Sequence, residues 1–149
     1  MTKDHWICFA LLVACCFAAA AGCDRSGGGV VVKGTLLDGG QPAVFTQDSH
    51  EYELQFFPLD DAGDFAKAPS YRTNVDNKDG TFQVRDLAGR KGIPPGKYRV
   101  AIYRMYDSRD VWQGKFGQRT SPFTVEVKPG EPVTIELKGA KPTGPAGPT

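Results

Sequence analysis

The sequence predicts an all-β protein, an antiparallel β-sandwich of seven strands, and three observations predict it. Between residues 30 and 138, apolar side chains recur at every second position, which is the spacing of a strand with one buried face. Turn-forming residues separate these segments, and the 149 residues include 18 Gly and 11 Pro. No segment of comparable length shows the three-and-four spacing of a capped helix.

Four of the expected strands lie before residue 90. Segment 30–36 places valines and Leu36 on one face, and the turn-forming run 38–42 follows it. Segment 52–57 has Tyr, Leu and Phe at alternate positions until Pro58 ends it. Segment 70–75 is more polar, as expected of an edge strand. The run 76–80 supplies hairpin-forming residues, so segment 82–87 should pair with the strand before it.

The other three expected strands are 98–103, 123–127 and 133–137. The first is the clearest, because Tyr98, Val100 and Ile102 share one face while Arg99, Ala101 and Tyr103 share the other, which should face water. Pro and Gly separate the last two segments. With turns between them, seven short strands predict two packed sheets over residues 30–138. The tail, 139–149, is rich in Pro and Gly and should be disordered.

All four cysteines lie at the amino-terminal end, at positions 8, 15, 16 and 23. A disulfide framework would distribute cysteines through the domain that it stabilises, so none is expected. Residues 6–21 form an uncharged run of 16 residues, which is short for a bilayer-spanning helix of about 20 residues. The run has the length of a secretory h-region followed by small residues. Residues 1–22 are therefore predicted to be a signal peptide.

Residues 20–23, Ala-Ala-Gly-Cys, resemble the lipobox of bacterial lipoproteins. The resemblance implies cleavage before Cys23, a diacylglycerol on its sulfur, and a lipid anchor in the membrane of the cell envelope. Residues 23–29 would then be a flexible tether. Residues 12–15, Leu-Val-Ala-Cys, are an alternative lipobox, although cleavage there would leave a second apolar run on the mature chain. Ordinary secretion and a retained anchor are further alternatives.

Several classes of function are disfavoured by composition. Lys and Arg number 18 and Asp and Glu 17, so no basic excess indicates nucleic-acid binding. His50 and Glu53 have the spacing of a zinc motif, but the only other histidine is His5, in the expected signal peptide. No serine lies in a nucleophile-elbow context. We therefore expect no metal, no cofactor and no enzyme.

One segment, 103–116, is rich in aromatic and basic residues. Tyr103, Tyr106, Trp112 and Phe116 alternate there with Arg104, Arg109 and Lys115. Aromatic residues with arginines are typical of binding surfaces, and sugar rings stack on such residues. In the alternative arrangement, Trp112 and Phe116 fold back as a lid over one end of the sandwich, because a small domain rarely exposes so much aromatic area.

Three stretches, taken in order, resemble a known family. They read VVVKGTLLDGGQP, then GTFQVRDL with GIPPGKYRVAIY, and finally TSPFTVEVKPGEPVTIEL. This order, following a lipobox, is similar to the carboxypeptidase regulatory-like family, in the form found in small lipoproteins of planctomycete-type bacteria. The resemblance implies a transthyretin-like or Ig-like sandwich with no catalytic residues to transfer.

The expected function is that of a cell-envelope lipoprotein with one non-enzymatic binding or structural module. Its partners would be the membrane, through the lipid, and an envelope protein or polysaccharide. The alternative is a secreted glycan- or peptide-binding domain that uses the 103–116 segment.

Overall fold

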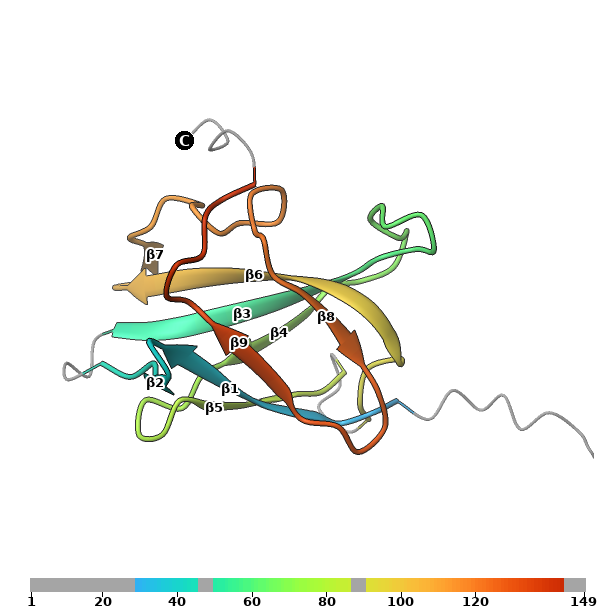
Figure 1. The fold of residues 1–149 in the computed structure, drawn as a ribbon, viewed down its shortest axis with the longest axis horizontal. Helices are drawn as coiled ribbons and strands as arrows, with labels where there is room; N and C mark the ends of the chain where they lie inside the picture. The colour runs from blue at the N-terminus through green and yellow to red at the C-terminus, as the bar shows by residue number, and fades with distance from the viewer. Residues whose placement is uncertain (1–28, 46–49, 87–90, 144–149) are drawn as a thin grey trace, which may run out of the picture.

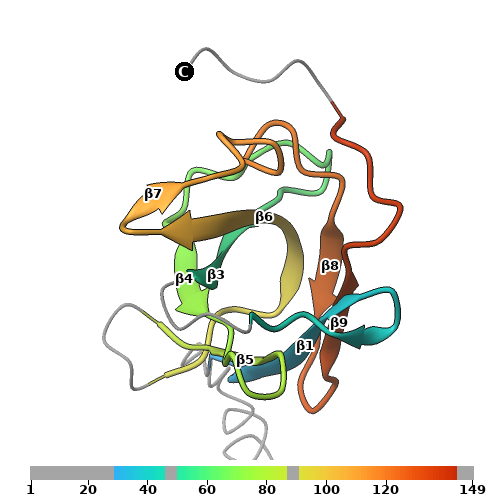
Figure 2. The same cartoon turned by 90° about the vertical axis from the view of Figure 1, so that its left-hand side faces the viewer.

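The computed structural model describes residues 29–45, 50–86 and 91–143. This part of the chain contains strands and no helix, so it has no helix that could cross a membrane. The strands form two sheets that face each other (Figures 1 and 2), which confirms the predicted all-β class and fits a β-sandwich. The strands are β1 (Val32–Asp38), β2 (Gln41–Pro42), β3 (His50–Pro58), β4 (Tyr71–Asn74), β5 (Thr81–Val84), β6 (Gly96–Tyr106), β7 (Arg109–Asp110), β8 (Thr124–Val127) and β9 (Val133–Glu136).

The described residues thus form nine strands rather than seven. All seven expected segments coincide with strands, and the two additional ones are β2 and β7, of two residues each. A two-residue strand has no side-chain period, so alternation in the sequence does not reveal it. β2 pairs with the end of β1 in the region expected to be a turn, and β7 pairs with the end of β6 in the region expected to be a loop.

The four-stranded sheet is mixed rather than purely antiparallel. β1 lies in its middle, antiparallel to β2 and β5, with Thr35 opposite Thr81. β9 pairs with β1 in parallel, with Leu36 opposite Ile135. The chain reaches β9 from β8, a strand of the other sheet. β9 then runs in the same direction as β1 (Figure 1).

The five-stranded sheet is built on one long antiparallel pair of strands. β3 and β6 are antiparallel over nine residue pairs, from His50 opposite Tyr106 to Pro58 opposite Tyr98. β4 lies beyond β3, at the edge of the sheet. β8 and β7 both pair with β6, near its beginning and its end respectively.

The core lies between the two sheets and is filled by the predicted inner faces. Leu36 on β1, Leu54 and Phe56 on β3, and Val100 and Ile102 on β6 are completely buried. Burial of a side chain of this size stabilises a fold by about 1.5–3 kcal/mol. The alternation read from the sequence therefore identifies the core correctly.

The outer face of β6 differs from the prediction. Ala101, expected to face water, is completely buried, and its partner Gln55 on β3 is 8% exposed. The segment 59–70 returns over this face. Gln55 Nε2 donates to Ser70 Oγ at 2.8 Å, and the Arg99 guanidinium carbon lies 5.3 Å from the centroid of the Phe65 ring. Segment 59–70 has no regular alternation of apolar residues, so the sequence did not indicate that this segment would cover a sheet.

The structure describes part of the chain at each end of the domain. The described chain joins the sandwich through Val30, whose backbone exchanges two hydrogen bonds with Ile93. Near the other end, the Thr143 amide donates to the Thr120 carbonyl oxygen at 2.8 Å, so the tail follows the domain at least to this residue. The predicted signal peptide, Cys23, nearly all of the predicted tether and residues 144–149 lie outside the described residues.

Candidate functional site

The hairpin from β6 to β7 and the residues that follow it are organised by one carboxylate. Asp110 Oδ1 accepts hydrogen bonds from the amides of Arg104, at 3.2 Å, and Trp112, at 3.0 Å. Asp110 Oδ2 accepts one from the amide of Gly114 at 2.7 Å. Hydrogen bonds to a charged group are about twice as strong as neutral ones. Asp110 therefore fixes the path of the chain toward Trp112.

Trp112 and Phe116 come together at one end of the core. Their rings are 5.3 Å apart between centroids and nearly perpendicular. Phe116 is 3% exposed, and its carbonyl oxygen accepts a hydrogen bond from the amide of Ile102. Trp112 is half-buried and lies 5.6 Å from the Tyr52 ring. These two side chains therefore pack as a lid over the end of the sandwich, and they do not form an open aromatic patch.

Tyr103 and Tyr106 lie on opposite faces of β6. Tyr103 is on the outer face, opposite Glu53, and burial raises the pKa of its phenol although Arg72 acts in the other direction. Tyr106 is on the inner face at the end of the strand and is 46% exposed. The structure thus separates Tyr103 from the other three aromatic residues of the predicted surface.

Tyr106 instead joins a cluster that includes residues from a distant part of the sequence. Two cross-strand pairs stand side by side at the end of the five-stranded sheet, Tyr52 with Arg104 and His50 with Tyr106. The His50 and Tyr106 rings stack at 4.6 Å, and the Phe45 ring lies 4.4 Å from Tyr52 and 5.4 Å from His50. We call these five residues, together with Trp112, the aromatic end.

Arg104 is the one arginine of the aromatic end, and no acidic side chain among the described residues forms an ion pair with it. Its guanidinium carbon lies 4.8 Å from the centroid of the Phe45 ring, in a cation–π contact. Within the described part of the chain its side chain makes no hydrogen bond or ion pair, and its Nε is buried. The nearby Asp110 carboxylate is occupied by three backbone amides. Burial raises the pKa of Tyr52, and the proximity of Arg104 only partly offsets this effect.

His50, like Arg104, has a buried side-chain nitrogen without a described hydrogen-bond partner. Its Nδ1 is buried without a hydrogen bond among the described residues, while its carbonyl oxygen accepts from Asn77 Nδ2. His50 is the first residue of β3. Glu53, the second member of the zinc-like spacing, forms an ion pair with Arg72 at 3.5 Å. The aromatic end thus contains two polar side chains whose hydrogen-bonding capacity the described protein leaves unused.

The sequence pattern missed Phe45 and His50 as members of this cluster. Both lie some fifty residues before the 103–116 segment and meet it only because β3 and β6 pair along their full length. A register of that kind depends on tertiary pairing, so no local motif could have revealed it. Arg104 was identified only as one of three basic residues in the segment.

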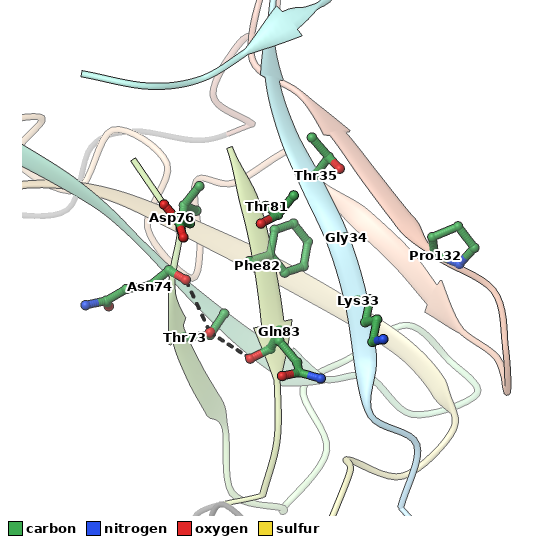
Figure 3. A pocket seen from close by; sticks show the side chains of 11 residues that line it. Lys33, Gly34, Thr35, Thr73, Asn74, Asp76, Thr81, Phe82, Gln83 and Pro132 are labelled. Carbon is green, nitrogen blue, oxygen red and sulfur yellow. Dashed lines mark hydrogen bonds between the residues drawn. The ribbon is translucent and has the colours of Figure 1, made fainter. Parts of the chain in front are cut away.

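A groove lies on the outer face of the four-stranded sheet (Figure 3). This open groove has a volume of about 740 Å³. Its floor is formed by Lys33 and Thr35 of β1 and by Thr81 and Gln83 of β5, and one wall by the β4 segment that includes Asn74. Local sequence gave no sign of it, because β4 and β5 come from different sheets and diverge at their ends.

The polar groups of the groove are largely used within the protein. Thr73 Oγ1 donates to the Gln83 carbonyl oxygen at 2.9 Å (Figure 3), and Asn74 Nδ2 donates to Glu51 Oε2. Thr81 Oγ1 donates to an Asp79 carboxylate oxygen at 2.7 Å. The groove therefore offers fewer unsatisfied groups to a ligand than the aromatic end does. No family model, curated protein or solved structure matches this chain.

Proposed function

We propose that this protein is a cell-envelope lipoprotein in which Cys23 carries the lipid and the sandwich is a non-enzymatic binding module. The lipobox-like residues 20–23 and the restriction of all cysteines to the first 23 residues support the anchor. Two or more acyl chains would hold the protein stably at the membrane, since each buried methylene contributes about 0.8 kcal/mol. The order of the strand and turn motifs supports a carboxypeptidase regulatory-like sandwich, transthyretin-like or Ig-like in kind.

The binding role is supported by the position of the aromatic end, which lies at the opposite end of the domain from the start of the described chain. The described chain begins beside β1 at one end of the sandwich, where Val30 meets Ile93 (Figure 1). His50 and Tyr106 lie where β3 begins and β6 ends, at the opposite end. A lipid attached through the short segment 23–29 would therefore direct the aromatic end away from the bilayer, toward partners in the envelope.

Membrane fractionation of cells that produce the full chain tests the anchor. The wild type should sediment with membranes and dissolve only in detergent, and Cys23→Ala should be released as a soluble exported protein. Cys15→Ala is the matched control, because it removes a cysteine from the alternative lipobox and should leave the protein in the membrane fraction. Release of the wild type, or retention of Cys23→Ala, would contradict the anchor and favour a secreted binding domain.

The binding role has its own test. Trp112 is the only tryptophan outside the predicted signal peptide and contacts Tyr52 of the aromatic end. A titration of its fluorescence with solubilised envelope polysaccharides should give a saturable change. Absence of any response across such a panel would favour a structural module over a binding module.

A further inference from the structure

We infer that the aromatic end binds an acidic sugar, a pyranose unit that carries a carboxylate. Arg104 would pair with the carboxylate, and the ring of Tyr106 would pack against the face of the sugar. The inference rests on the proposed binding function and specifies its ligand class. It does not depend on the lipid anchor.

Arg104 carries a charge that no described ion pair neutralises. A half-buried guanidinium without a counter-ion costs folding free energy, because burial removes solvent from the charge. Only its Nε is among the buried atoms without a partner, so the two terminal nitrogens, which make no described hydrogen bond, remain open to solvent. Those two nitrogens form a planar pair of donors that matches the two oxygens of a carboxylate.

The environment of Arg104 favours an external anion over an internal one. Asp110, which lies on the neighbouring strand β7, directs its oxygens to backbone amides. Burial is the main cause of the raised pKa of Tyr52, and Asp38 adds to it, so Asp38 is an acidic group near this end; it forms no described ion pair with Arg104. The Phe45 ring beneath the guanidinium holds it in place, so little side-chain freedom would be lost on binding.

The position of Tyr106 adds the sugar-binding element. Residues 104 and 106 are two apart on one strand, so their Cα atoms lie about 7 Å apart and their side chains share one face. This spacing suits one pyranose ring with a carboxylate at its edge. Tyr106 is 46% exposed, and its ring is supported from behind by His50 at 4.6 Å. A supported, exposed ring can stack on a sugar without rearrangement.

The decisive experiment compares two probes on the wild-type protein, purified as the mature chain in detergent. One is a trimer of α-1,4-linked galacturonate and the other is its methyl ester, which has the same rings without the charge. Titration followed by Trp112 fluorescence and by calorimetry should show at least about tenfold tighter binding of the acid. Equal binding of acid and ester, or no binding of either, would overturn the inference.

Variants then assign the contacts. Arg104→Gln should weaken binding of the acid about tenfold or more, whereas Arg119→Gln, which removes the same charge from an exposed position outside the aromatic end, should change it less than about twofold. Tyr106→Ser should weaken both probes about threefold to tenfold. Equal loss in both arginine variants would overturn the pairing with Arg104. If Arg104→Gln fails to fold, the acid–ester comparison on the wild type still decides.

Three further results distinguish a failure of the acidic-sugar inference from a failure of the proposed lipid anchor. A glutamate tripeptide that binds as tightly as the acid trimer would overturn the assignment to a sugar. A lipidated protein that binds neither sugar probe would contradict the inference and leave the envelope anchor intact. A soluble, unmodified protein that binds the acid trimer would contradict the anchor and support the inference.

Discussion

The carboxylate of Asp110 holds the backbone of Trp112, whose amide donates to Asp110 Oδ1 at 3.0 Å. The same carboxylate receives the amides of Arg104 and Gly114. One side chain therefore links the end of β6 to the residues that close the sandwich, and it positions both the arginine and the tryptophan of the aromatic end.

Asp110→Ala should lower the free energy of unfolding by about 2 kcal/mol, because three amides lose a charged acceptor. Trp112 should become more exposed, with a red shift of its emission. Urea unfolding followed by fluorescence measures both effects. Asp61→Ala, at an exposed position of the 59–70 segment, is the control and should change stability by less than about 0.5 kcal/mol. Equal effects of the two substitutions would contradict the role of Asp110.

Gly34→Ala should destabilise the sandwich by about 3 kcal/mol. A Cβ at this position would lie 2.3 Å from both Phe82 Cζ and the Val133 carbonyl oxygen. The second of these contacts involves backbone of the neighbouring strand β9, so Phe82→Leu should not rescue the variant. Thr35→Ala, the next residue along β1, should cost far less. Thermal unfolding of the three variants checks this prediction, and a wild-type melting temperature for Gly34→Ala would contradict the described packing.

Glu136 should contribute stability that depends on pH. Its carboxylate accepts hydrogen bonds from the amides of Gly39, Gly40 and Lys138 at 2.8–2.9 Å, and these hold its pKa below the ordinary value of 4.5. A carboxyl with a lowered folded-state pKa stabilises the fold above its unfolded-state pKa, and this contribution is lost as pH falls through the folded-state value. The melting temperature of Glu136→Ala should therefore lie below that of the wild type at pH 7.

The lowered pKa of Glu136 also predicts how this difference in melting temperature varies with pH. The two melting temperatures should converge as the pH is lowered below 4.5. Glu131→Ala is the control, because its exposed side chain accepts none of the described hydrogen bonds. A difference between Glu136→Ala and wild type that stays constant down to acid pH would show that the carboxylate charge is not the cause.

Tyr98 should make the protein sensitive to alkali. Burial raises the pKa of its phenol from 10.0 to about 12, with a smaller effect of Tyr71, and the hydroxyl donates to the Pro94 carbonyl oxygen at 2.7 Å. A raised folded-state pKa means that this stabilisation is complete below pH 10 and is lost as pH rises toward 12. Tyr98→Phe should cost about 1 kcal/mol at neutral pH and unfold less steeply in alkali. Parallel alkaline profiles would contradict this.

The sequence predicted most of the fold because period-two alternation reports burial directly. It identified Leu36, Leu54 and Ile102 as core residues and placed strands in all seven expected segments. It missed β2 and β7, which are too short to have a period, and it missed the parallel pairing of β9 with β1. The strand pairing expected between segments 70–75 and 82–87 was wrong, because β4 pairs with β3 and β5 pairs with β1 in the other sheet. Pairing partners and directions are set by how the two sheets meet, and an isolated strand pattern does not contain that information.

The candidate site was predicted only in part, for a similar reason. The 103–116 segment contains Arg104, Tyr106 and Trp112, all of which belong to the aromatic end. The sequence could not show that Tyr103 faces outward, or that Phe45 and His50 reach the segment from before and at the beginning of β3. Nor could it show that the Asp110 carboxylate accepts hydrogen bonds from three backbone amides, or that Arg104 has no counter-ion among the described residues.

The intact mass of the mature protein tests the central proposal most directly. The full chain would be produced in a bacterium that processes lipoproteins, extracted in detergent and measured by mass spectrometry. We expect a chain that begins at Cys23 and carries the additional mass of a diacylglycerol and an amide-linked acyl chain, with the same product from Cys15→Ala. An unmodified chain, a chain that retains residues 1–22, or lipid attached at Cys15 would contradict it.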